Sequence, residues 1–433
     1  MLTAFYQAFR TPDLRKKLLF TIFIIIVFRL GASLPTPGVS ETAVHTCVAG
    51  ATKTGILGLV NLLSGGALLH LTVFALGIMP YITASIILQL LAVVIPRLET
   101  LRKEGAAGTA KITQYTRYLT IGLAILQSTA IIALANSGNL FPGCTANLIP
   151  NQSVFTISTM VICMTAGTAV IMWLGELITD RGVGNGMSLL IFTQVIAVIP
   201  GQLYQIKQSE GTFIFLLVLA VGVLIVAAVA FMEQAQRRIP VQYAKRMVGR
   251  KMYGGTSTYI PLKVNQAGVI PVIFASSLMY IPALAANLFG NKNATSGWAL
   301  WVQTHLIRGD DAYYMAGFFV LIILFTYFYV SITFNPDEVA ENMRKAGGFI
   351  PGIRPGGPTA GYLRFVLNRL TAPGSLYLGI VALIPMLAIA LVHAGSQFPL
   401  GGTSILIAVG VGLDTVKQVE SQLQQRNYEG FLR

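Results

Sequence analysis

The chain has 433 residues, of which 54% are hydrophobic and 11% are charged, and its formal net charge is +14. Together with a mean hydropathy of +0.69, this composition excludes an ordinary soluble enzyme and indicates a polytopic membrane protein. Three cysteines are too few for a disulfide framework.

Ten apolar windows predict an all-α membrane protein. The first follows Arg15-Lys16-Lys17 and precedes Gly31-Ala32-Ser33, which is also the pattern of a secretory signal. Removal of such a leader would leave nine spans and stays an alternative. The ten windows are residues 18–34, 71–95, 115–135, 155–174, 188–203, 213–232, 267–288, 316–334, 375–392 and 403–416.

Residues 54–96 contain no Asp, Glu, Lys or Arg in 43 positions. As one helix they would extend roughly 65 Å at ~1.5 Å per residue, about twice the ~30 Å hydrocarbon core. One crossing preceded by a half-helix fits this length, with Ser64-Gly65-Gly66 as the break. A half-helix must line a cavity because irregular backbone cannot face lipid. The stretch therefore predicts a pathway through the membrane.

The distribution of Lys and Arg predicts the orientation. With the N-terminus inside, 25 of the 30 basic residues lie in inner segments, 4 lie in outer segments, and Arg29 lies in the first span. Both termini are therefore expected in the cytoplasm. The outer connection at residues 203–213 divides the spans five and five, so that residues 1–207 and 208–433 are expected to form two inverted halves.

Residues that carry chemistry are scarce in the predicted spans. Arg29 lies near an outer end and is interpreted as an anchor or packing residue, and Glu176 and Asp180 are expected to be solvated at an inner end. Cys47 and Cys144 fall in outer loops, where a disulfide between them stays open. We find no catalytic, nucleotide-binding or metal-binding motif, so no enzyme activity, cofactor or metal is expected. A partner must then supply the energy.

Two inner loops, residues 233–266 and 335–374, are more basic than orientation requires. In the first, alternating stretches at 239–244 and 256–264 flank Gly254-Gly255 and predict a projecting ribbon. In the second, Asn335 and Pro336 predict the start of a helix that stops before Gly347, and a Pro- and Gly-rich loop follows. A docking site for an acidic partner is favoured over a plain anchoring loop. The candidate docking residues are Arg237, Arg238, Lys245, Arg246, Arg250, Lys251 and Arg354.

Several long motifs resemble the SecY family, the central channel subunits of the bacterial Sec protein translocon. The resemblance runs from near the N-terminus to the final NYEGFLR. It implies ten transmembrane helices in two inverted five-helix halves around a central pore, with a plug half-helix and a lateral gate to lipid. The motifs are NLLSGGALLHLTVFALGIMPYITASIILQLL, KEGAAGTAKITQYTRY, WLGELITDRGVGNGMSLLIF, VNQAGVIPVIFASS, NPDEVAENMRKAGGFIPGIRPG and PLGGTSILI.

The resemblance also implies how the pore is closed. A ring of apolar side chains excludes water and ions and offers no specific hydrogen bond to a sliding polypeptide. Its members here are Ile78, Ile82, Met187, Ile191, Ile273 and Ile407. Met187 departs from the usual β-branched residue and is expected to soften the seal. The plug corresponds to residues 55–68, with plug and hinge residues Leu57, Leu59, Asn61, Leu62, Leu63, Ser64, Gly65 and Gly66.

Gln89 and Asn185 match polar positions of the family's lateral gate, and a simple hydrogen bond between spans is the alternative role. The basic loops match those that dock the SecA motor and the translating ribosome, where ribosomal RNA would be the nucleic acid contacted. The resemblance further implies SecE and SecG subunits, signal peptides, nascent polypeptides and membrane lipids as partners, in the plasma (inner) membrane of a bacterium.

The resemblance implies a protein-conducting channel that translocates unfolded polypeptides and releases hydrophobic segments into lipid. The alternative is a secondary transporter of a small solute, which a pair of charges at mid-membrane would indicate. A scaffold without a pore is disfavoured because it has no use for the break at Ser64-Gly65-Gly66.

Overall fold

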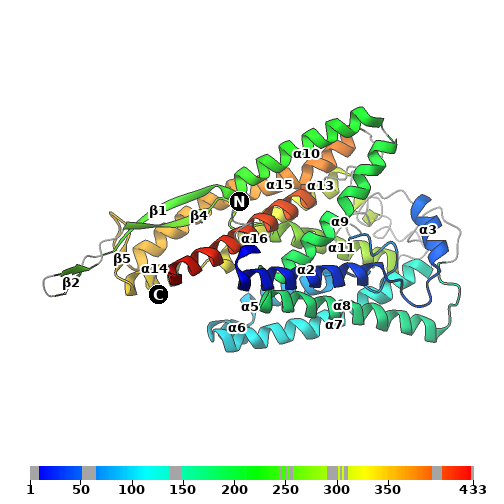
Figure 1. The fold of residues 1–433 in the computed structure, drawn as a ribbon, viewed down its shortest axis with the longest axis horizontal. Coiled ribbons are helices and arrows are strands. Elements are labelled where there is room, and N and C mark those ends of the chain that lie inside the picture. The colour runs from blue at the N-terminus through cyan, green and yellow to red at the C-terminus, as the bar shows by residue number, and fades with distance from the viewer. Residues whose placement is uncertain are drawn as a thin grey trace.

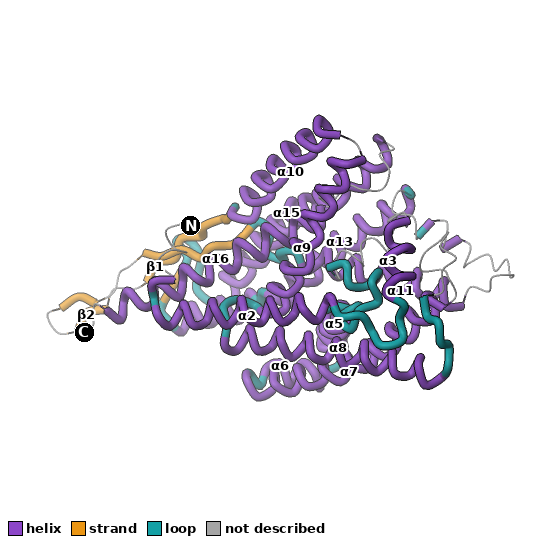
Figure 2. Tube along the Cα trace, turned by 45° about the vertical axis from the view of Figure 1, so that its right-hand side comes forward, coloured by secondary structure: helices purple, strands orange, loops and turns teal. Residues whose placement is uncertain are grey.

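The computed structural model describes residues 9–50, 65–136, 148–209, 211–243, 246–248, 251–253, 257–289, 301–302, 305–306, 311–392 and 402–430. Helices form a bundle, and strands project from one end of it (Figures 1 and 2). The helices are α2 (Pro12–Ser33), α3 (Glu41–Gly50), α5 (Met79–Val94), α6 (Pro96–Lys103), α7 (Ala106–Asn136), α8 (Val154–Arg181), α9 (Gly186–Ser209), α10 (Gly211–Gln234), α11 (Ile270–Phe289), α13 (Ala312–Thr333), α14 (Pro336–Lys345), α15 (Gly357–Val392) and α16 (Gly402–Gly430).

Each of the ten predicted windows overlaps one of these helices. Within the described residues, five helices are long and apolar enough to cross a membrane, and a sixth is added if the bent pair α5 and α6 counts as one span. The apolar parts of α9 and α11 are shorter, and Pro200 and Pro282 lie inside these two helices. The chain is thus a multi-pass membrane protein, and these helices do not confirm the exact count of ten spans.

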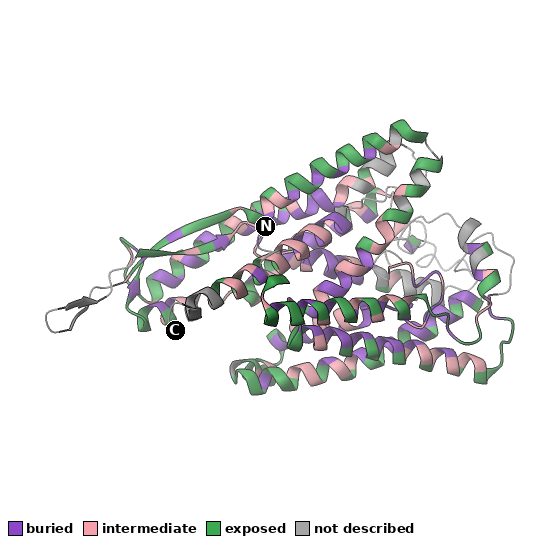
Figure 3. Cartoon of the chain, in the orientation of Figure 1, coloured by how far each residue is buried: buried purple, intermediate pink, exposed green. Residues whose placement is uncertain are grey.

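The outer face of the bundle is apolar, as a lipid-facing surface requires. Large side chains such as Phe23, Leu126 and Leu224 are exposed there. The buried residues concentrate inside the bundle (Figure 3). The largest hydrophobic cluster among them has members in α2, α3, α5, α7, α8, α9, α10, α11, α13, α15 and α16.

The prediction that the second span begins at residue 71 is wrong, because α5 begins only at Met79 and residues 65–78 form turns. Leu71 has φ 47°, in the left-handed region that a leucine seldom adopts and that a helix cannot include. Its side chain is fully buried, and its carbonyl accepts a hydrogen bond from the N–H of Thr36. Tertiary packing therefore holds this apolar segment out of the helix.

The helices pack in two groups that follow the chain order. In the first group α7 lies against α5 and α8, and α8 lies against α2 and α9. In the second, α13 lies against α11 and α15, and α15 contacts α16. The groups meet where α11 contacts α5 and α7, and where α9 contacts α10 and α16.

The strands join the two basic loops into one folded unit. The strands are β1 (Gln236–Tyr243), β2 (Arg246–Val248), β3 (Lys251–Tyr253), β4 (Ser257–Lys263) and β5 (Gly348–Phe349). β1 pairs with β4 along its length and with β5 at its end, whereas β2 and β3 form a separate antiparallel pair. The projecting ribbon is confirmed. The pairing of β2 with β3 places a reversal of the chain between Val248 and Lys251, and the predicted turn at Gly254-Gly255 lies outside the described residues.

One ion pair lies at the start of α13. Asp311 accepts a hydrogen bond from the N–H of Tyr313 and caps the helix. Its other carboxyl oxygen lies 2.6 Å from Nδ1 of His305. The hydrogen bond with His305 is the main reason that the pKa of Asp311 is lowered, and the bond from Tyr313 adds to this shift.

Candidate functional site

All six side chains expected to form a ring belong to the large hydrophobic cluster of the bundle. Ile78 and Ile407 are 1% exposed, and Ile191 and Ile273 are 7% and 8% exposed. Ile82 and Met187 pack against the same cluster as partly buried members. These residues come from α5, α9, α11 and α16, and thus from both groups of helices. We call this set the apolar ring.

The start of α5 places Ile78 and Ile82 on the same face of the helix. Ile78 is the N-cap residue, and Pro80 follows in the first turn, where its missing N–H leaves no helical hydrogen bond unmade. The N–H of Ile82 donates to the carbonyl of Ile78 at 3.1 Å, which places the two side chains on one face of the helix.

Met187 is held in place by a close contact between α8 and α9. A Cβ atom on Gly186 would lie 1.8 Å from the carbonyl oxygen of Gly175, so these helices approach as only glycine permits. A Cβ atom on Gly175 would lie 2.5 Å from Sδ of Met187, which therefore covers this glycine. A flexible methionine can follow the surface of α8 here more easily than a β-branched side chain.

The predicted plug is described only at its end. Leu57, Leu59, Asn61, Leu62, Leu63 and Ser64 lie outside the described residues. Gly65 and Gly66 have φ 68° and 89°, a conformation that favours glycine and breaks a helix. A Cβ atom on Gly65 would lie 3.2 Å from Cα of Gln194 in α9, whereas one on Gly66 would have no described neighbour within 4 Å. The two hinge candidates are therefore not equivalent.

The two polar gate candidates make local hydrogen bonds. Oδ1 of Asn185 accepts from the N–H groups of Met187 and Ser188 and so caps α9. Nε2 of Gln89 donates to Ser85, one turn earlier in α5. Both remain candidates for the gate. The contact of α11 with α5 and α7 is one of the two described places where the helix groups meet.

A second candidate site is the unit that β1, β4, β5, α14 and the start of α15 form, which we call the basic platform. Its core contains Ile239, Val241, Leu262, Met343, Ile350, Leu363 and Val366. Arg237 and Arg238 are exposed on β1, and the guanidinium of Arg238 lies 4.8 Å from the centre of the Tyr259 ring. Arg246 and Lys251 lie in β2 and β3, and Lys245 and Arg250 fall outside the described residues.

Arg354 lies in the constrained loop that the sequence predicts. Its side chain is exposed, and its carbonyl accepts a 2.8 Å hydrogen bond from the buried hydroxyl of Thr359. Gly352 and Gly356 on either side have φ 82° and 101°. Turns and the Thr359 hydrogen bond therefore fix the backbone that presents the guanidinium.

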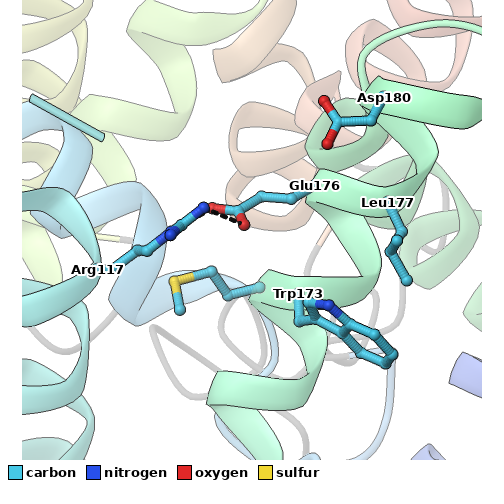
Figure 4. A pocket seen from close by; sticks show the side chains of 6 residues that line it. Arg117, Trp173, Glu176, Leu177 and Asp180 are labelled. Atoms are coloured by element: carbon cyan, nitrogen blue, oxygen red, sulfur yellow. Dashed lines mark hydrogen bonds and ion pairs between the residues drawn. The ribbon is translucent and has the colours of Figure 1, made fainter. Parts of the chain in front are cut away.

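A pocket of about 440 Å³ lies between α7 and α8 and contains an ion pair (Figure 4). Arg117 of α7 binds both carboxyl oxygens of Glu176 of α8, at 2.9 and 2.8 Å. The expectation that Glu176 is solvated is wrong, because its side chain is 22% exposed and paired. The pair lies near the C-terminal end of α8, which stops at Arg181.

The structure describes two of the three cysteines and several buried polar groups. Cys47 is disulfide-bonded, Cys163 is free, and Cys144 lies outside the described residues. Nη1 of Arg29 is buried without a hydrogen-bond partner among the described residues. Sequence reasoning missed Gln194. Whether the amide of a buried glutamine has a hydrogen-bond partner can be seen only in the tertiary structure.

Comparisons with known proteins agree with this arrangement. The SecY family model matches residues 72–416. A relative named protein translocase subunit SecY from Streptomyces galbus is 65% identical over 440 residues, and one from Mycobacterium tuberculosis strain H37Rv is 60% identical over 441, with 100% of both chains covered in each case.

Solved structures support the same fold. One described as a protein conducting channel has a TM-score of 0.65 at 18% identity and covers 94% of this chain and 92% of its own. The Sec61 channel in a canine ribosome-channel complex from the endoplasmic reticulum has a TM-score of 0.63 at 17% identity, with the same coverage.

Proposed function

This chain belongs to the SecY family, and we propose that it forms a membrane channel that conducts unfolded polypeptides and releases hydrophobic segments sideways into lipid. The apolar ring is the observation that supports the proposal most directly. Four helices from two groups contribute these aliphatic and thioether side chains to the same hydrophobic cluster. Such a constriction seals against water and ions, yet it gives a sliding polypeptide no polar group to bind.

We further propose that residues 1–207 and 208–433 are the two halves of the channel and that the plug lies between them. The contact of α11 with α5 and α7 supports a lateral gate at this place, because two packed helix groups can separate there without breaking a covalent connection. Gln89 and Asn185 are the polar residues proposed for that gate, and Gly65 with Gly66 for the plug hinge.

The basic platform is proposed to face the cytoplasm of a bacterium, on the same side of the inner membrane as both termini. Its exposed arginines suit an acidic or RNA-bearing partner. The SecA motor and the translating ribosome are the proposed partners. A channel similar in fold is described in a complex with a ribosome. SecE and SecG are proposed as further subunits. The chain itself is proposed to be passive, and these partners supply the work.

Cysteine crosslinking of a stalled secretory polypeptide tests the channel directly. We expect one cysteine in the stalled chain to form disulfides with Ile78→Cys, Ile273→Cys and Ile407→Cys in membranes that contain the whole translocon. Ile281→Cys is the matched control, because Ile281 lies in α11 with 46% of its surface exposed. Equal crosslinking to Ile281→Cys, or none to the ring positions, would exclude the proposed path.

A further inference from the structure

Gln194 is a buried polar residue that the channel proposal does not explain. It is 1% exposed, and neither Nε2 nor Oε1 of its amide has a hydrogen-bond partner in the described part of the chain. A glutamine amide offers two donor hydrogens and an acceptor oxygen, and burying them unpaired is unfavourable. Such a group in a native protein calls for a functional explanation.

The position of Gln194 connects it to the apolar ring. Met187, Ile191 and Gln194 are separated by four and three residues in α9, so they lie on one face of the helix. Met187 and Ile191 are ring residues. Gln194 follows Ile191 by one turn, on the side away from the helix start at Gly186. It is therefore a polar group directly beside an otherwise apolar constriction.

Gly65 packs against the base of the Gln194 side chain. A Cβ atom on Gly65 would lie 3.2 Å from Cα of Gln194 and 3.3 Å from both Cβ and Cγ. Gly65 also has φ 68°, where only glycine is unstrained. The described end of the proposed plug thus packs against the base of this side chain.

We propose that Gln194 is a gating residue that contacts the polypeptide in the open channel. This inference rests on the proposed function. In the closed channel, the packing around Gln194, to which Gly65 contributes, keeps the amide buried without a partner among the described residues, which weakens the closed state. When Gly65 moves away, the amide faces the pathway and pairs with peptide groups of the passing chain. Every peptide unit carries the same donor and acceptor, so one amide serves substrates of any sequence.

The first experiment uses substitutions that act in opposite directions. Gln194→Met removes the unpaired amide at similar length, and we expect about a tenfold lower open probability, because relieving one such group favours the closed state. Gly65→Ala adds a methyl group against Gln194 in a strained backbone, and we expect about a tenfold higher open probability. Ion conductance of the reconstituted translocon in planar bilayers measures both. Gln424→Met on the exposed part of α16 is the control.

The second experiment tests contact with the substrate. A stalled secretory chain with a single cysteine should crosslink to Gln194→Cys as well as it does to Ile273→Cys. Ile196→Cys is the matched control, because Ile196 lies on the opposite face of α9 and is 39% exposed. Membrane content of each variant confirms insertion. If Gly65→Ala does not accumulate, the Gln194 variants carry the test alone.

The outcomes separate this inference from the proposed function. If Gln194→Met conducts as the unchanged channel does, or if Gln194→Cys crosslinks no better than Ile196→Cys, Gln194 has no gating role even though the ring positions crosslink. If no ring position crosslinks, the proposed function is wrong, and the role of Gln194 that rests on it is wrong as well. A lower open probability in Gln194→Met together with crosslinking at position 194 supports the inference.

Discussion

Replacing Ile273 with asparagine tests the seal quantitatively. Ile273 is 8% exposed within the apolar cluster, and burial of such a side chain contributes about 1.5–3 kcal/mol. An asparagine amide there would be unpaired, at a cost of about 1–3 kcal/mol. Both effects act on the closed channel only, because the position is wet when the pathway opens. The closed state should therefore lose about 2.5–6 kcal/mol, which raises the ratio of open to closed channels by about 10²–10⁴.

Single-channel recording of the reconstituted translocon measures this ratio, and export of a substrate with a defective signal sequence measures it in cells. We expect Ile273→Asn to leak ions and to relax signal recognition. Ile273→Leu keeps the volume and the apolar surface, so it should stay close to the unchanged channel. An open probability of Ile273→Asn equal to that of Ile273→Leu would show that Ile273 is not part of the seal.

Three further substitutions test other parts of the molecule. Arg354→Glu should leave insertion of the channel intact but block export of a signal-bearing substrate, and normal export would refute the docking role. Gly186→Ala places a methyl group 1.8 Å from the Gly175 carbonyl. It should lower the free energy of unfolding by about 1–3 kcal/mol, whereas Gly201→Ala, with no described neighbour within 4 Å, should not. The lowered pKa of Asp311 predicts that the unchanged protein is more stable than Asp311→Asn near neutral pH. This difference should begin to shrink as the pH falls below about 4 and disappear once the pH is below the lowered pKa of Asp311, and a difference that does not change with pH would contradict the assignment.

Local sequence signals predicted the elements that local chemistry determines. The Oδ1 atom of Asn335 accepts from the N–H of Asp337, as an N-cap should, and Gly347 with φ 72° follows α14. The alternating residues of the basic loop form β1 and β4 as expected. The ring residues were predicted from the family resemblance, since their apolar character alone does not distinguish a constriction from an ordinary core.

Features that depend on distant partners were not predictable from the sequence. Leu71 lies in an apolar run that favours a helix, yet its left-handed backbone follows from contacts with Thr36 and the cluster. Glu176 is paired because α7 places Arg117 beside it. β5 pairs with β1 across more than a hundred positions, which no local pattern specifies. Gln194 is buried in a place where Gly65, more than a hundred positions earlier in the chain, packs against it.

The basic platform and the apolar ring are connected by a very short segment. β4 ends at Lys263, α11 begins at Ile270, and Ile273 lies in the first turn of that helix. Between them the buried Asn265 donates hydrogen bonds to Glu233 at the end of α10 and to the carbonyl of Gly268. Because these bonds leave the segment little freedom, a displacement of β4 must either break them or move the start of α11. A partner that binds the platform would therefore act close to Ile273, a residue proposed to seal the channel.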